Sequence, residues 1–381
     1  MTNQGRKRSR SCEEVYAKKR LRTRRSKDPL IVLPNELHEL VFHHLSGNDV
    51  LNASEVSRLW YQETVDSKSC AKTFRINIDD IFELPERSDL KQLQHSPRRY
   101  QHIHIRWDYL GSNNNECWNV IKAHSQDIKT LSIANLMMAD NSETTLVFPK
   151  LKKLTILHQI NWLYNPTYVL LKANNNLTCL VLDVDFDTRM CDFFEQNQTL
   201  KELELSSNLM LSLLLMDALN DVKFKLTKLK ISRSIFSFMD NNFNTFLTSQ
   251  ADSLEEIEVF GVPTEVFNLI FNDFKAIRVL NIKRIYNFYY INVHPNETLR
   301  TFTSDLPLEG LAPIIIAATN LEVLQVHILE TEMMEFISRN ARNLKTLLFK
   351  LKTGDVYEHY KNLKTQTTNL NNNIEVSEVL Y

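Results

Sequence analysis

Between residues 128 and 349, apolar side chains recur in one spacing: an apolar residue, two others, an apolar residue, one other, and a third apolar residue. The last two apolar positions are two residues apart, so in an extended strand both side chains point to the same face. The pattern therefore predicts one short strand in each copy. Ten copies begin at intervals of 22 to 28 residues, at Ile128, Leu151, Leu177, Leu200, Leu226, Leu254, Ile277, Leu299, Leu321 and Leu344.

Weaker copies of the same pattern flank these ten. We expect three further strands, over Ala71/Phe74/Ile76, Tyr100/Ile103/Ile105 and Ile374/Ser377/Val379.

The segments that return from one strand to the next carry a different period. In Thr264–Phe274 and Thr331–Ala341 the apolar residues follow helical spacing, and each segment begins with Thr followed by an acid. Threonine at this place is typical of a helix N-cap, and acids favour the first turn. We therefore expect helices between the strands, with the threonines as their caps.

A single strand-and-helix copy cannot bury its apolar face alone, so neighbouring copies must stack. The period and the spacing resemble the leucine-rich repeat. That resemblance implies an α/β solenoid with parallel strands inside and helices outside. One feature departs from the family, which usually has Asn or Cys three positions after the last strand residue. Only Asn208 fits here, and residues such as Leu136, Gln159 and Val262 stand at the equivalent positions.

Residues 29–65 have the pattern of three short helices. The first would start at Pro34, a favourable first helical residue, and carry the apolar stripe of Leu37, Leu40, Val41 and Leu45. After a break at residues 46–48, Asp49–Asn52 would form a single turn. Ser54 would then cap a third helix. Apolar residues occupy more than one face of these helices, which indicates that another surface covers part of them.

The same segment resembles an F-box from end to end. Its motifs are Leu33-Pro34-x-Glu36-Leu37, Val41-Phe42-x-x-Leu45, Asp49-Val50-Leu51 and Val56-Ser57-Arg58-x-Trp60. In that family these positions dock a Skp-type adaptor, which links to a cullin and a RING subunit. The resemblance therefore implies adaptor contacts by Leu33, Pro34, Glu36, Leu37, Val41, Phe42, Leu45, Val50, Leu51 and Trp60.

An F-box followed by leucine-rich repeats is similar to a group of substrate receptors of SCF-type ubiquitin ligases. We expect three regions: a disordered basic tail at residues 1–27, an F-box at 28–70, and a repeat array with degenerate terminal repeats at 71–381. A receptor of this kind needs no catalytic site, because the ligase chemistry belongs to its partners. Which protein substrate it would bind does not follow from the sequence.

The tail contrasts in charge with the rest of the chain. Residues 1–27 hold 11 basic and 2 acidic residues, a net of +9, whereas the rest holds 34 basic and 44 acidic, a net of −10. An acidic body argues against a nucleic-acid-binding surface along it. The two basic clusters predict a bipartite-like nuclear import signal, which suggests a location in the nucleus, the cytoplasm or both. Its residues are Arg6, Lys7, Arg8, Lys18, Lys19, Arg20, Arg22, Arg24 and Arg25.

Candidate chemistry is sparse. The six glycines are isolated, so no phosphate-binding glycine loop or nucleophile elbow can be built. The five cysteines include no CxxC, and the chain has no secretory signal peptide and no long apolar run, which favours a reduced, intracellular protein without a membrane span. His102 and His104 share a strand face but are too few for zinc. We predict no catalytic residue, no cofactor and no metal.

The repeat register predicts which side chains face the concave side of the solenoid. Acid, base and acid would follow one another on three neighbouring strands, about 5 Å apart. Such a stripe either pairs across strands on a solvated sheet or recognises a partner. The predicted substrate face comprises Glu202, Glu204, Lys228, Lys230, Glu256, Glu258 and Phe260.

Two alternatives to the receptor interpretation remain open. A repeat scaffold could bind partners, including the adaptor, without directing ubiquitylation. A nucleic-acid-associated protein could act through the basic tail, with strongly salt-dependent binding.

Overall fold

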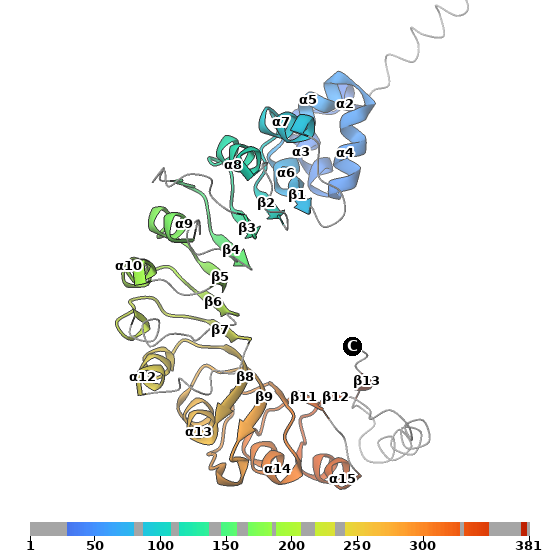
Figure 1. Ribbon diagram of the computed structural model, residues 1–381. Coiled ribbons are helices and arrows are strands. Elements are labelled where there is room, and N and C mark those ends of the chain that lie inside the picture. The colour runs from blue at the N-terminus through green and yellow to red at the C-terminus, as the bar shows by residue number, and fades with distance from the viewer. Residues whose placement is uncertain are drawn as a thin grey trace, which may run out of the picture.

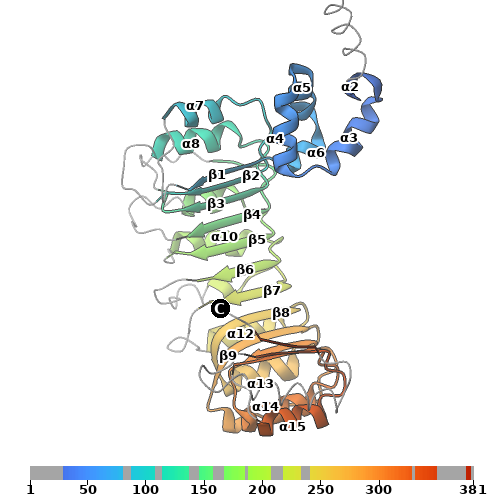
Figure 2. The ribbon, with the colours of Figure 1, turned by 90° about the vertical axis from the view of Figure 1, so that its right-hand side faces the viewer.

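The computed structural model describes residues 29–79, 87–107, 114–136, 146–157, 167–184, 188–206, 218–232, 241–327, 331–349 and 375–378. These residues form a curved array of strands and helices, with a bundle of short helices at its N-terminal end (Figure 1). The strands line the inner side of the curve and the helices cover the outer side (Figures 1 and 2). The predicted α/β solenoid is confirmed.

One parallel sheet runs through the described part of the array. Its 13 strands pair in sequence order, each with the next, so every connection passes from one strand to its neighbour. The strands are β1 (Arg75–Asp79), β2 (His102–Arg106), β3 (Thr130–Ala134), β4 (Lys153–Leu157), β5 (Cys179–Asp183), β6 (Glu202–Leu205), β7 (Lys228–Ile231), β8 (Glu256–Pro263), β9 (Val279–Tyr286), β10 (Thr301–Ser304), β11 (Val323–Val326), β12 (Thr346–Phe349) and β13 (Glu375–Glu378).

Burial alternates along the strands, as the period-two pattern predicts. On β2, for example, Ile103 and Ile105 are buried while His102, His104 and Arg106 are partly exposed. Apolar residues of successive strands stand side by side in register and form a continuous core between the sheet and the helices. One such row contains Leu131, Leu154, Leu180, Leu203, Leu229 and Ile257. Burying each of these side chains contributes roughly 1.5–3 kcal/mol to stability.

The return segments of the array are mostly helical. Their helices are α7 (Arg87–Gln94), α8 (Asn114–Ala123), α9 (Thr167–Ala173), α10 (Cys191–Gln196), α12 (Asn241–Gln250), α13 (Thr264–Asp273), α14 (Leu308–Ala317) and α15 (Thr331–Asn340), with short 3-10 turns η3 (Thr188–Met190) and η4 (Phe288–Tyr290). The predictions of α13 and α15 are confirmed to within one residue. Thr264, however, is not a cap: Pro263 holds that position, and the Thr264 hydroxyl donates to the backbone carbonyls of Tyr286 and Asn287.

Buried amides join neighbouring turns, at a position other than the one the leucine-rich-repeat family uses. Asn197 donates to the carbonyl oxygen of Asn175 at 2.7 Å and accepts from the N–H groups of Thr199 and Leu200. Asn296 makes the equivalent bonds to Phe271, Thr298 and Leu299. Asn174 differs, because it donates to the carbonyl oxygen of Leu146 and accepts from the N–H group of Phe148. All three asparagines are buried. Each lies three residues before the first apolar residue of its repeat, so these amides satisfy buried backbone groups that would otherwise lack partners.

Two of the weaker repeat copies were predicted in the wrong register. Ile76 pairs with Ile103 and Ile78 with Ile105, so the first copy is shifted by two residues from Ala71/Phe74/Ile76. At the other end, Val376 rather than Ser377 stands beside Leu347. Both copies lie at the ends of the array, where the apolar pattern is poorest and a register error is hardest to detect.

Among the described residues, none of the helices combines the length and the apolar character that crossing a membrane requires.

Candidate functional site

Five short helices precede β1: α2 (Pro29–Val32), α3 (Asn35–His43), α4 (Gly47–Val56), α5 (Arg58–Asp66) and α6 (Lys68–Thr73). Serine side chains cap the N-termini of three of these helices, α4, α5 and α6. Ser46 and Asp49 form a capping box on α4, Ser57 accepts from the N–H of Trp60, and Ser67 accepts from the N–H of Cys70. These caps satisfy N–H groups that have no partner inside the helix.

Part of the helix prediction was wrong. The second element is a full helix rather than a single turn, and Ser57 rather than Ser54 caps the third. Ser54 is buried within α4, where its hydroxyl donates to the Leu51 carbonyl at 2.6 Å and accepts from Arg98 at 2.9 Å. A serine can cap a helix or bond within it, and the contact with Arg98 fixes the second role here.

Glu39 connects α3 with the last helix of this module, α6. Its carboxylate accepts hydrogen bonds from the Ser67 hydroxyl and from the N–H groups of Lys68 and Ser69, at 3.0 to 3.1 Å. Partial burial alone would raise the pKa of Glu39, but the bonds from Ser69, Lys68 and Ser67 together hold it below its ordinary value. The carboxylate therefore stabilises the start of α6 from α3, a role that sequence reasoning missed.

The predicted adaptor-binding residues divide into two groups. Leu37, Val41 and Leu51 are exposed on the surface of the module, as are Pro34 and Glu36. Phe42 is 1% exposed and Val50 is 0% exposed, because both pack inside the module. For Phe42 and Val50 the prediction of direct adaptor contact is corrected: they are core residues that support the surface. Leu33, Leu45 and Trp60 are partly buried, and Trp60 packs edge-on against Phe42.

Exposed apolar side chains concentrate on this module. Of the 13 large apolar residues exposed in the described part of the chain, nine lie between residues 31 and 61. Leu37, Leu40 and Val41 share one face of α3, because residues three and four apart are neighbours on a helix. The motif comparison alone did not select all of the nine, which are Ile31, Val32, Leu37, Leu40, Val41, Leu51, Val56, Leu59 and Tyr61.

Comparison with protein-family models gives a match over this same module: residues 30–72 match the family described as F-box-like. These helices are an F-box-like domain. Within the described part of the chain, the domain thus carries the largest group of exposed apolar side chains. A search of curated proteins found no significant match to the chain.

On the concave side of the sheet, the alternation of charge follows the predicted strand register. Lys228 stands between Glu202 and Glu256, and Lys230 between Glu204 and Glu258. We call these six residues the charged stripe. Lys228 Nζ lies 2.6 Å from Glu256 Oε1, and Lys230 Nζ lies 3.1 Å from Glu204 Oε1 and 3.7 Å from Glu258 Oε1.

The lysines of the charged stripe are held in their charged form. The hydrogen bond with Glu256 raises the pKa of Lys228. Burial alone would lower the pKa of Lys230, but the hydrogen bond and charge of Glu204, with the charge of Glu258, raise it. With four carboxylates to two lysines, the stripe carries a formal net charge of −2. Whether it recognises a substrate stays a prediction.

Phe260, the last residue of the predicted substrate face, lies two residues beyond Glu258 on β8 and so on the same face of the strand. Its ring is partly exposed and lies 5.8 Å from Lys283 Nζ and 5.6 Å from the guanidinium carbon of Arg284. The concave side thus presents an aromatic ring beside cations, next to the charged stripe.

The histidine pair lies on β2 and Cys179 lies on β5, so both belong to strands of the sheet. His104 Nδ1 lies 2.9 Å from the Ser132 hydroxyl, and within the described residues no group of three or more His, Cys, Asp or Glu comes together to hold a metal ion. Burial raises the pKa of the Cys179 thiol to about 12, with Glu202 and Glu204 adding to the rise and Lys153 opposing it. That thiol is protonated at neutral pH and is a poor nucleophile. The predicted import residues, Arg6 to Arg25, lie outside the described residues.

Proposed function

We propose that this chain is the substrate-recognition subunit of an SCF-type ubiquitin ligase. In this proposal the F-box-like domain docks a Skp-type adaptor, which connects to a cullin and a RING subunit, and the solenoid binds the protein to be ubiquitylated. The observation that carries the proposal is the concentration of exposed apolar residues on the F-box-like domain. Soluble proteins rarely expose large contiguous apolar patches unless another surface covers them.

The face of α3 supplies the centre of the proposed adaptor contact. Leu37, Leu40 and Val41 are 40%, 58% and 43% exposed, and burying apolar side chains of this size stabilises a complex by roughly 1.5–3 kcal/mol each before the costs of association. Phe42 and Val50 are buried in the core of the same domain, so α3 is held on a packed support.

For the substrate surface we propose the concave side of the sheet. It combines the charged stripe with a partly exposed aromatic ring at Phe260, an arrangement that suits a protein partner. The chain itself would supply binding and orientation, while the covalent chemistry would be carried out by the other subunits. The basic tail would direct part of the pool to the nucleus.

The test is co-purification of adaptor and cullin from cells with tagged chains. Leu37→Glu/Val41→Glu places two charges on the exposed face of α3 with residues that favour helix. We expect wild type to retain both partners and this variant to lose both, with an unchanged circular dichroism spectrum. Ile316→Glu, at another exposed apolar position, on α14, is the control and should retain both.

Two results would count against the proposal. Absence of both partners from wild-type preparations would refute adaptor docking. Recovery of the adaptor without cullin would favour the repeat scaffold that binds partners without directing ubiquitylation.

A further inference from the structure

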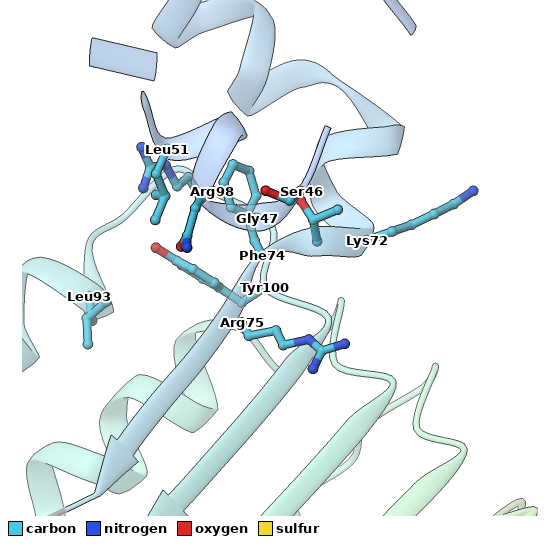
Figure 3. Close-up of a pocket in the computed structure, with 11 residues that line it drawn as sticks. Ser46, Gly47, Leu51, Lys72, Phe74, Arg75, Leu93, Arg98 and Tyr100 are labelled. Atoms are coloured by element: carbon cyan, nitrogen blue, oxygen red, sulfur yellow. The ribbon is translucent and has the colours of Figure 1, made fainter. Parts of the chain in front are cut away.

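A cavity of about 530 Å³ lies where the F-box-like domain meets the first repeat (Figure 3). We call it the junction cavity. The start of α4 forms one wall through Ser46, Gly47 and Asn48, and the opposite wall comes from the end of α6, β1 and the segment before β2. Its volume falls within the range of small-molecule sites, roughly 300–1,000 Å³.

Three cations line the junction cavity: Lys72, Arg75 and Arg98. None of the three has an acidic partner among the described residues. The nearest acid in sequence to the α4 wall, Asp49, does not line the cavity, and its carboxylate is engaged with the Ser46 hydroxyl and N–H. The lining therefore carries three formal positive charges and no compensating carboxylate.

Arg98 is held in place while the other two cations are exposed. Its Nη2 donates to Ser54, and its guanidinium carbon lies 5.6 Å from the Tyr61 ring centre and 5.0 Å from that of Phe74. In Figure 3, Lys72 and Arg75 extend toward the same side of the cavity, away from Leu93. The cavity thus has one cation held in place, Arg98, and two exposed cations, Lys72 and Arg75, whose side chains extend to one side.

The remaining lining is apolar or aromatic. Leu51, Phe74, Leu93 and Tyr100 line the cavity beside the cations. An inorganic anion would use only the charged part of this lining. A ligand that pairs an anionic group with an organic body would use both parts, since apolar walls with a few placed polar groups are the usual composition of a ligand site.

The positive field extends to the adjoining strand. His102 on β2 stands beside Arg75 on β1 in the strand register. Burial first, and then the charges of Arg75 and Lys129, lower the pKa of His102. Both charges that act on this imidazole are positive, so an anion bound near Arg75 would be favoured electrostatically.

We propose that the junction cavity binds an organic phosphate, with the phosphate group near Lys72 and Arg75 and the organic body against Leu51, Phe74 and Tyr100. A dianionic phosphate matches several unpaired cations better than a single carboxylate does, and arginine presents a donor geometry suited to its oxygens. A phosphorylated side chain of a protein and a free phosphorylated small molecule share this chemistry. Because the walls belong to both the F-box-like domain and the first repeat, the bound ligand bridges the two.

The first test is isothermal titration calorimetry with three probes: O-phosphotyrosine, inorganic phosphate and tyrosine. We expect O-phosphotyrosine to bind with a Kd below about 1 mM, at least tenfold tighter than either other probe. Arg75→Glu should weaken this binding at least tenfold, and Arg75→Lys, which keeps the charge but loses the planar set of donors, should weaken it less. Lys223→Glu makes the same kind of charge change at an exposed site just before β7, so it should bind like wild type.

Equal binding by wild type and Arg75→Glu, or no binding of either phosphate probe to wild type up to about 10 mM, would overturn the proposal. A separate readout is the pKa of His102, followed by NMR in protein with labelled histidine. Saturation with O-phosphotyrosine should raise that pKa, because the bound anion offsets the charges of Arg75 and Lys129. An unchanged value would contradict binding at this place.

A second calorimetric experiment distinguishes the source of the ligand by comparing O-phosphotyrosine with peptides that contain phosphotyrosine. Much tighter binding of a peptide indicates a protein-borne phosphate, and equal binding indicates a small molecule; either supports the site.

The inference is independent of the proposed adaptor docking. Leu37→Glu/Val41→Glu should bind O-phosphotyrosine like wild type, so the failure of one proposal can be told from the failure of the other.

Discussion

Arg98 Nη2 donates a hydrogen bond to the Ser54 hydroxyl at 2.9 Å and so ties the first repeats to a helix 44 residues earlier in the chain. The same guanidinium stacks on Tyr61 and Phe74. Removing it in Arg98→Ala is expected to lower the free energy of unfolding by about 1–3 kcal/mol. Urea denaturation measures the change, and Arg99→Ala, at the exposed neighbouring arginine, should alter it by less than about 0.5 kcal/mol. Equal effects of the two substitutions would contradict this role.

Glu39 should make the F-box-like domain sensitive to acid. Its pKa is lowered in the folded chain, so its contribution is fully present above the ordinary pKa of 4.5 and is lost as the pH falls through the lower folded value. Glu39→Gln removes the charged acceptor for the N–H groups at the start of α6. We expect it to lower the free energy of unfolding by about 0.5–2 kcal/mol at pH 7. Thermal unfolding of wild type and variant between pH 7 and pH 3 checks this. Two curves that stay parallel throughout would show that Glu39 does not titrate with folding.

Phe42 and Leu37 should differ sharply in their effect on stability, although both belong to the F-box motif. Phe42→Ala leaves a cavity beside Trp60 and is expected to cost about 3–5 kcal/mol, whereas Leu37→Ala removes an exposed side chain and should cost less than about 1 kcal/mol. Hydrogen exchange over residues 30–72 measures each loss. If Leu37→Ala destabilised the domain as much as Phe42→Ala, the division into core and surface residues would be wrong.

The charged stripe should show measurable coupling between its partners. A double-mutant cycle with Lys228→Met and Glu256→Gln is expected to give an interaction energy of about 0.2–1 kcal/mol, because both groups are partly exposed. The coupling should shrink as salt is raised, since exposed ion pairs are screened. Coupling that is absent at low salt would show that the 2.6 Å contact contributes nothing to folding and would leave these residues free for recognition.

The basic tail should control location in the cell. A fluorescent fusion that lacks residues 1–27 is expected to lose nuclear accumulation, and replacing the tail arginines by lysine should preserve it, because the charge is retained. Fluorescence microscopy scores the nuclear fraction. An unchanged nuclear fraction would reject the import signal, and salt-dependent nucleic-acid binding that disappears with the deletion would assign the tail another role.

Strand positions could be predicted because they depend on local periodicity alone. The Leu131-to-Ile257 row follows from apolar residues two apart, and helices α13 and α15 from spacing three and four apart. The register of the first and last copies was predicted wrongly because these copies contain few apolar residues. Nothing local then distinguishes a register shifted by one or two residues.

The site was less predictable because its geometry depends on distant partners. Ser54 and Ser57 are equally good caps by residue type, and only Arg98 makes Ser54 a buried bridge. Likewise, Phe42 and Val41 are adjacent apolar residues, and which of them faces solvent depends on where α5 and α6 pack. The junction cavity joins segments that lie dozens of residues apart, so no spacing in the sequence could indicate it.

The sheet ends at β1, which has a partner strand on one side only. An uncovered strand edge offers backbone donors and acceptors to any other chain, and terminal repeats of solenoids need a cover to remain soluble. The F-box-like domain packs at this end, with α6 running directly into β1 (Figure 1). A variant that lacks the residues before β1 would therefore be prone to self-association. Loss of function in that variant would say little about adaptor binding. We therefore expect the domain that would recruit a ligase to keep the array soluble as well.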